Sequence, residues 1–314
     1  MVCLMRKKQK IVVIGDIFAD MTTHLMSFTN QGERTFGTPL SRNGGGTGGN
    51  IASGLGILGA DVSIICRLGD DETGHYLKED IKNYHVDTSG ISIVTGESSA
   101  IVIVGVIPGG ERTIWVLGND SAYEKLSEKE MEYLEKADPD IIFVTGVMLS
   151  VHPAAETIRK VLPAWKGRAR IYFDPNLCVP VSSITEELRE SMQEISRQSD
   201  VVLTGKIEME ALGLKPQAGQ TFIVKDGERG SCSINEREEL LCKMPAMPQK
   251  AIDATGAGDT YAAAFVYAEM EGKSVEEAMR YATVAAGISV TIPGARCMPE
   301  KQRIEESLKG WNGK

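Results

Sequence analysis

The segment Asp253-Ala-Thr-Gly-Ala-Gly-Asp259 ends in an acid, and a helix-forming run, Tyr261–Met270, follows it. Gly256 and Gly258 allow successive backbone N–H groups to converge at the N-terminus of that helix, where unpaired donors and the helix dipole hold anions. This pattern predicts a phosphate site. An acid beside such a site can take the proton of an alcohol while the N–H groups stabilise the transferred phosphoryl group, or it can be an ordinary N-cap. Residue types alone leave both roles of Asp259 open.

A second glycine cluster, Arg42–Asn50 (RNGGGTGGN), precedes the helix-like run Ile51–Leu58. Its Gly-x-Gly-x-x-Gly spacing matches the dinucleotide fingerprint, but that fingerprint must directly follow a buried strand, and the residues before it are polar and include a proline. We interpret the cluster as a flexible loop whose backbone approaches a small polar ligand, with the Asn50 amide available to hydroxyl groups. The alternative is that these glycines only allow a helix to pack closely on a sheet.

A third cluster, Val224–Ser231 (VKDGERGS), lies between two apolar runs. A hairpin turn is one interpretation, and contact between Lys225 and a polyphosphate is the other. The pattern Gly-x-x-x-x-Gly-Lys-Ser/Thr occurs nowhere in the chain, which excludes a Walker-type nucleotide site.

The elements that must position these clusters follow from hydrophobic patterning. Short runs rich in Val and Ile are typical of strands buried on both faces, and they alternate with amphipathic stretches of helical length. Such alternation favours a parallel sheet with helices on both sides. The predicted strands lie at 10–15, 62–66, 140–144, 170–174, 200–203 and 221–224, and the predicted helices at 73–84, 154–165, 185–197 and 274–290.

One region breaks this alternation. The runs Ile91–Thr95, Ile101–Ile107 and Arg112–Val116 are separated by turn residues, with no helical pattern between them. We interpret them as an antiparallel excursion outside the main sheet, with Met21–Pro39 as its companion. The sequence therefore predicts one main domain over residues 1–314, with a small β lid formed from about 17–40 and 90–118.

The composition limits the partners. The net charge is −9 over 314 residues, which disfavours electrostatic binding to nucleic acid or anionic lipid. The six cysteines are scattered without a Cys-x-x-Cys spacing, so neither a zinc site nor a disulfide framework is expected. No apolar run near the N-terminus has the length of a signal segment or a membrane span. We expect a cytoplasmic protein with no nucleic-acid or membrane partner.

Taken in order, the clusters resemble the ribokinase-like carbohydrate kinases, also called the PfkB family. Gly45–Asn50 and Arg67–Gly74 resemble its N-terminal signature, and Asp253–Asp259 resembles its C-terminal signature. The resemblance implies a three-layer α/β/α sandwich with a mostly parallel central sheet and a small β-sheet lid, which in many members also pairs two subunits. It further implies an ATP-dependent kinase that needs Mg2+ and a monovalent cation such as K+, and transfers the γ-phosphate to a primary hydroxyl of a small carbohydrate.

The resemblance also implies roles for individual residues. Asp259 matches the catalytic base, which its position at a helix N-terminus should keep ionised, and the amides of Gly256, Ala257 and Gly258 match the anion hole. The positions that match the sugar-hydroxyl site are Asp20, Gly45, Gly46 and Asn50, with Asp16 nearby.

Other matching positions concern the nucleotide and the metals. Lys225 and Gly227 match the loop over the nucleotide, and Thr283 matches the contact with adenine. Glu208 matches the acid that orients a magnesium-bound water. Asp253, with the Gly294 turn, is similar to the monovalent-cation site.

Several positions depart from the family pattern. Gly205 stands where many members have Asn, and Phe18 and Gly146 stand where ribokinases proper carry Asn and Glu, so ribose is not the favoured substrate. Cys178 stands where sugar-acid kinases often carry Arg. Phe18 could stack on a sugar or a base. A nucleoside kinase of the same family is therefore the alternative activity, and a catalytically idle sugar-binding regulatory protein is the alternative from another class.

Overall fold

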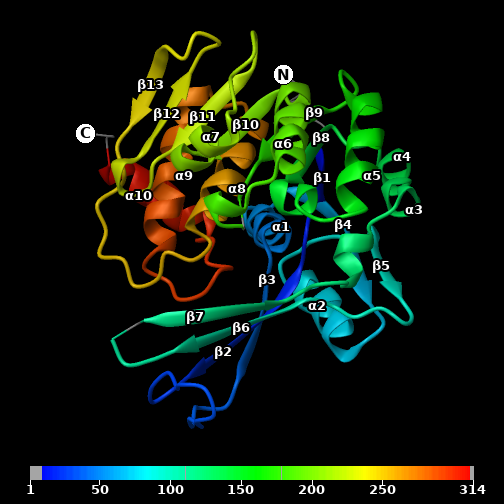
Figure 1. Cartoon of the computed structure of the whole chain (residues 1–314). Coiled ribbons are helices and arrows are strands. Elements are labelled where there is room, and N and C mark those ends of the chain that lie inside the picture. The colour runs from blue at the N-terminus through cyan, green and yellow to red at the C-terminus, as the bar shows by residue number, and fades with distance from the viewer. Residues whose placement is uncertain (1–8, 110, 178, 312–314) are drawn as a thin grey trace.

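A large mixed sheet runs through the middle of the protein (Figure 1). The computed structural model describes residues 9–109, 111–177 and 179–311, so that Gly110 and Cys178 lie outside the described residues. The sheet order is β13-β12-β11-β10-β9-β8-β1-β4-β5, parallel from β11 to β5 and antiparallel at the β11–β12–β13 edge. Its strands are β1 (Lys10–Ile14), β4 (Asp61–Gly69), β5 (Ile91–Val94), β8 (Ile141–Thr145), β9 (Arg170–Asp174), β10 (Val201–Gly205), β11 (Thr221–Lys225), β12 (Ser231–Ile234) and β13 (Leu240–Met244). The predicted apolar runs form its parallel part.

Helices cover both faces of this sheet (Figure 1). The side chains of β1 show why, because Ile11 and Val13 belong to the core beneath α1, α8 and α9, whereas Val12 and Ile14 belong to the core on the opposite face. The three-layer α/β/α prediction is confirmed. The helices are α1 (Thr47–Ile57), α2 (Glu72–Lys82), α3 (Glu128–Met131), α4 (Tyr133–Ala137), α5 (Ala154–Val161), α6 (Glu186–Gln198), α7 (Lys206–Leu212), α8 (Ala257–Met270), α9 (Val275–Ser289) and α10 (Lys301–Gly310).

A second, smaller sheet projects from one end of the sandwich (Figure 1). Its order is β3-β2-β6-β7, with β2 (Phe18–His24), β3 (Ser41–Gly45), β6 (Ile101–Val106) and β7 (Arg112–Leu117). The hairpin between β6 and β7 is antiparallel, as expected, whereas β2 and β6 pair in parallel, which the prediction of an antiparallel excursion missed.

Two local predictions were wrong. Ile91–Val94 does not join the small sheet, because β5 pairs in parallel with β4 at the edge of the large sheet. The glycine cluster 42–50 is not a flexible loop, because β3 and the first turn of α1 account for nearly all of it. Short apolar runs specify a strand but not the sheet that the strand joins.

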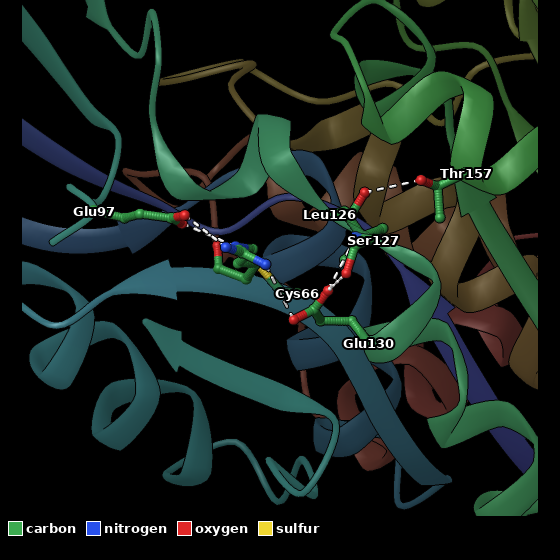
Figure 2. Close-up of polar contacts among 7 residues, drawn as sticks. Cys66, Glu97, Leu126, Ser127, Glu130 and Thr157 are labelled. Carbon is green, nitrogen blue, oxygen red and sulfur yellow. Dashed lines mark hydrogen bonds and ion pairs between the residues drawn. The ribbon is translucent and has the colours of Figure 1, made fainter. Parts of the chain in front are cut away.

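The chain that enters β6 is anchored by residues of the Arg67–Gly74 signature. The Arg67 guanidinium donates to both oxygens of Glu97, at 2.8 and 2.5 Å, and to Glu130 at 3.3 Å. Figure 2 shows these bonds to Glu97 and Glu130, and the bonds that Ser127 donates to Glu130 at the N-terminus of α3. Asp71 accepts the Ser99 N–H at 2.7 Å. The signature residues therefore fix the direction in which the small sheet leaves the sandwich.

Candidate active site

The carboxyl ends of the parallel strands bring most of the predicted residues to one edge of the large sheet. Asp16 is the second residue after β1, and Asp174, Gly205 and Lys225 are the last residues of β9, β10 and β11. Ligands of open α/β sheets bind beyond the carboxyl ends of the strands. The N-terminus of α8, which carries Asp259, is near this edge, because the Asn176 side chain, two residues after β9, donates to Asp259 at 2.9 Å.

Asp259 lies in the first turn of α8 and is only 7% exposed. Each of its carboxylate oxygens accepts one side-chain amide, from Asn50 at 2.8 Å and from Asn176 at 2.9 Å. Neither hydrogen bond is an N-cap bond, and no side chain caps the N-terminus of α8. The carboxylate is therefore held by α1 and by the turn after β9, and not by its own helix.

The expectation that the helix N-terminus keeps Asp259 ionised was wrong. The pKa of Asp259 is raised to about 7, because burial and the nearby charges of Asp174 and Asp16 raise it more than the Asn50 hydrogen bond and the Lys225 charge lower it. The helix N-terminus predicted the opposite direction. Desolvation dominates here because the carboxylate is buried, and repulsion from other buried acids adds to the shift. A carboxyl group with this pKa can accept a proton near neutral pH.

The predicted anion hole lies directly before Asp259. Gly256 adopts a left-handed conformation with φ of 73° and precedes the first residue of α8. Gly258 is exposed and its two predecessors are half-buried, so the turn is accessible from solvent. The Ala257 N–H already donates to Ala254 O at 3.2 Å, so one of the three predicted amide donors has an internal partner.

Asp20, Gly45 and Asn50 are among the residues predicted to bind sugar hydroxyls. Asp20 on β2 packs against Gly45 on β3, where an added Cβ would lie 2.2 Å from the Asp20 carboxylate. The pKa of Asp20 is raised to about 6, because burial and the Asp16 charge raise it more than the Arg296 charge lowers it. The Asn50 Oδ1 atom is buried and has no partner in the described part of the chain.

Asp16 lies beside Gly46, and its carboxylate is bonded to backbone amides. Its carboxylate accepts the Thr47 N–H at 2.9 Å and the Gly48 N–H at 3.2 Å, and is 1% exposed. An added Cβ at Gly46 would lie 2.8 Å from Asp16 Oδ2. Asp16 therefore holds the N-terminus of α1, the helix that presents Asn50, and offers no exposed carboxylate to a ligand.

Carboxylates suited to magnesium gather at the ends of β9 and β10. Lys225 Nζ contacts the fully buried Asp174 carboxylate at 2.5 Å, and burial raises the pKa of Asp174 to about 6. Glu208 accepts the Gly205 N–H at 2.7 Å and the Leu177 N–H at 2.8 Å, and its charge acts on both Asp174 and Lys225. Hard oxygen donors of this kind fit Mg2+, with water completing the shell. Both Glu208 oxygens keep lone pairs for such a water.

The predicted monovalent-cation site is less suitable. The Asp253 carboxylate accepts the Thr255 N–H and hydroxyl at 2.9 and 2.6 Å and the Gly294 N–H at 3.0 Å. The Arg112 guanidinium of β7 lies 3.9 Å from Asp253 and donates to Thr255 Oγ1 at 3.2 Å. A carboxylate that already accepts three hydrogen bonds and has a guanidinium beside it fits K+ poorly.

Comparison with known proteins settles the family. The chain matches the profile of the pfkB family carbohydrate kinases over residues 8–301. It belongs to that family. It is 28% identical to the ribokinase of Bacillus subtilis, covering 96% of this chain and 99% of the relative. It is 27% identical to the 5-dehydro-2-deoxygluconokinase of Clostridium tetani, covering 97% and 94%. An uncharacterized sugar kinase of Pyrococcus horikoshii, solved in complex with ATP, superposes with a TM-score of 0.82 at 25% identity, covering 94% and 99%.

The relatives identify the chain as a carbohydrate kinase, a phosphotransferase that acts on an alcohol group. The ribokinase-like fold is confirmed as well, because the ribokinase of Thermotoga maritima superposes with a TM-score of 0.78, covering 96% of this chain and 99% of the other. Within the described residues, no helix has the length and hydrophobicity that a membrane crossing requires.

Two residues predicted on the nucleotide side of this PfkB kinase differ in exposure. Gly227 lies at the exposed hairpin between β11 and β12, with no atom within 4 Å of an added Cβ. Thr283 is 6% exposed within α9, so it offers little surface to a nucleotide. Lys225 extends inward from the same hairpin toward Asp174, and an added Cβ at Gly258 would lie 3.9 Å from its Nζ. The two interpretations of residues 224–231, a hairpin turn and a contact between Lys225 and a phosphate, are therefore compatible.

Three positions that depart from the family pattern, Gly146, Gly205 and Phe18, lie close to neighbouring protein atoms. An added Cβ at Gly146 would lie 1.8 Å from Pro175 O, so the turn after β9 fills the space of a side chain there. An added Cβ at Gly205 would lie 2.9 Å from Glu208 Oε2. Phe18 packs edge-to-face on Tyr123, with ring centroids 4.9 Å apart, so a protein ring already occupies one side of it.

Residues that the sequence reasoning did not single out also reach the site. Asn176 donates to Asp259, and Asp174 pairs with Lys225. Arg112 of the small sheet donates to Thr255, and Arg296 lies against Gly44 and Gly49. Asn176 and Asp174 follow the buried run 170–174, and polar residues at the end of a predicted parallel strand were the signal available. Nothing local marks Arg112 or Arg296.

Proposed function

We propose that this PfkB kinase transfers the γ-phosphate of ATP to a primary hydroxyl of a small carbohydrate. Asp259 acts as the general base, and the amides of Gly256, Ala257 and Gly258 form the anion hole. The observation that carries the proposal is the state of Asp259: a buried carboxylate held by two carboxamides, with its pKa raised to about 7, beside a solvent-accessible turn at an uncapped helix N-terminus.

The proposed reaction is controlled by positioning and charge. Asp259 takes the hydroxyl proton as the alcohol oxygen attacks the γ-phosphorus and the bond to the ADP oxygen breaks. Backbone N–H groups of the turn and the Lys225 ammonium stabilise charge on the transferred group. Glu208 and Asp174 would hold Mg2+, which would supply further neutralisation of the phosphates. Asn50, with its unpartnered Oδ1, and Asp20 accept hydroxyl hydrogens of the sugar.

The deciding experiment measures ADP release with ATP and Mg2+ over ketoses, aldoses, sugar acids and nucleosides. Turnover of one sugar above an Asp259→Asn control supports the proposal, and turnover confined to nucleosides supports the alternative activity. No turnover on any compound, together with measurable sugar binding, supports the catalytically idle regulatory protein. The pattern among the sugars then identifies the substrate.

The pH dependence of kcat/KM for the sugar follows from Asp259. The reaction needs its unprotonated form, and its pKa of about 7 in the free protein means that protons compete below neutrality. We expect kcat/KM to rise about tenfold per pH unit up to about pH 7 and to level off above it. Initial rates between about pH 5 and about pH 9 test this. A flat profile through neutrality would contradict the assigned base.

We also propose that the small sheet acts as a lid and pairs two subunits. Its β7 strand exposes Ile114, Trp115, Val116 and Leu117, which are 45 to 58% exposed, and Phe36, in the segment after β2, is 79% exposed. Neighbouring exposed apolar side chains of this kind mark association surfaces. Sedimentation at micromolar concentration is expected to give twice the mass of the 34.0 kDa chain, and the mass of a single chain would exclude pairing.

A further inference from the structure

Arg296 lies in the loop between α9 and α10, and its side chain is only 4% exposed. Its Nη1 pairs with the Asp80 carboxylate of α2, and its Nη2 lies 3.5 Å from Gly45 O. An added Cβ would lie 2.3 Å from this guanidinium at Gly44 and 2.9 Å from it at Gly49. The guanidinium therefore occupies the space that side chains at these two glycines would need.

Arg296 is also the cation that faces Asp20. Its charge lowers the pKa of Asp20, against burial and against the Asp16 charge. The strand partners of Asp20, Asn43 and Val102, carry no charge, and Asp80 is already paired with Arg296. The Arg296 Nε atom is buried without a partner in the described part of the chain.

The two residues before Arg296 contact the phosphate side of the site. The Gly294 N–H donates to Asp253 at 3.0 Å, and Ala295 O lies 2.1 Å from the position of an added Cβ at Gly256. The consecutive residues 294–296 therefore contact two places. One is the turn at Gly256, which is proposed as the anion hole, and the other is the end of β3 at Gly44 and Gly45. A shift at one end of this segment is transmitted to the other through packed backbone.

We propose that Arg296, anchored by Asp80, is a positioning residue that holds Asp20 and the Gly44–Gly45 edge in register with the anion hole. This inference rests on the proposed function, because the register matters only if an alcohol and a phosphate meet between the two. Arg296 acts through Asp20 and the glycines, and it sets the affinity for the sugar more than the affinity for the nucleotide.

The test compares Arg296→Met, Arg296→Lys and Asp80→Asn with Arg159→Met. Arg159 is a matched control because it also pairs with a carboxylate, Glu194, at 2.6 Å, between α5 and α6. Binding of D-ribose, D-fructose and 5-dehydro-2-deoxy-D-gluconate is measured by calorimetry with ADP and Mg2+ present, and kinetics are measured on whichever compound turns over. Urea unfolding of each variant accompanies these measurements.

We expect Arg296→Met to weaken sugar binding and raise KM for the sugar by about tenfold or more, while KM for ATP changes less than about threefold. Protonation of Asp20 adds a second step to the acid limb that Asp259 sets, and in Arg296→Met this step should move to higher pH, because Asp20 loses its cation. Arg296→Lys should keep that step in place, because the charge remains. Asp80→Asn should raise the sugar KM in the same direction, and Arg159→Met should change neither constant.

Two failures are distinguishable. Wild-type protein that neither binds nor phosphorylates any sugar of the full panel overturns the proposed function, and the inference with it. Wild-type protein that binds a sugar, with Arg296→Met matching Arg159→Met in KM and pH profile, overturns the inference alone. If Arg296→Met does not fold, Arg296→Lys and Asp80→Asn carry the test, and normal sugar affinity in both overturns the inference.

Discussion

Replacing Asp259 with asparagine is expected to lower kcat by about 10³-fold, while the dissociation constant of ATP changes less than about threefold. The new amide cannot take the alcohol proton. Its shape fits the same pocket, because the Asn50 carboxamide can rotate and present its unpartnered Oδ1 to the new amide. ADP release at saturating sugar and ATP, with ATP affinity measured by calorimetry, checks both parts. Turnover near that of the wild type would show that another group is the base.

The stability of the same variant provides the control. Folding raises the pKa of Asp259 from 3.8 to about 7, so the folded state favours the protonated carboxyl group. That contribution to stability is fully present below about pH 4 and is lost as the pH rises through about 7. Asp259→Asn should therefore unfold at equal or higher urea concentration than the wild type at pH ~8, and this advantage should disappear in acid. Lost turnover with clearly lower stability at pH ~8 would instead indicate a damaged fold.

Much of the architecture could be predicted because parallel strands buried on both faces read as continuous apolar runs. β8 and β9, for example, lie within one residue of their predicted bounds. β5 was misplaced because its four residues carry no pattern that distinguishes the edge of the large sheet from a separate flap. The parallel pairing of β2 with β6 joins residues about 80 positions apart, for example Ala19 and Ile101, and no turn between them encodes it.

The site was predictable where chemistry is local and unpredictable where it is tertiary. The glycine turn before Asp259 and the amide of Asn50 could be singled out from residue types and a family resemblance. The state of Asp259 could not, because its pKa depends first on burial and then on Asp174 and Asp16, which arrive from the ends of other strands. The pair of Arg296 with Asp80 spans 216 positions, so only the folded chain brings these residues together.

Gly256→Ala is expected to cause the second-largest loss of activity. Gly256 has φ of 73°, which costs a residue with a side chain about 1–2 kcal/mol. Its new Cβ would lie 2.1 Å from Ala295 O, a backbone atom, so either the start of α8 or the segment that contains Ala295 must move. We expect kcat to fall by about 10²-fold, because backbone donors aimed at the transferred group lose their alignment. Steady-state rates and urea unfolding measure the two effects.

Gly167→Ala separates backbone strain from damage to the anion hole. Gly167 also has a positive φ, 82°, but no atom lies within 4 Å of its added Cβ, and it follows the short helix η3 (Leu162–Trp165) away from the carboxyl ends of the strands. This control should lose about 1 kcal/mol of stability with kcat unchanged. If Gly256→Ala loses no more kcat than Gly167→Ala, the amides before α8 do not stabilise the transferred phosphoryl group. The base at Asp259 would then act beside an anion site built elsewhere, with Lys225 as the nearest cation to examine, because its charge already acts on Asp259.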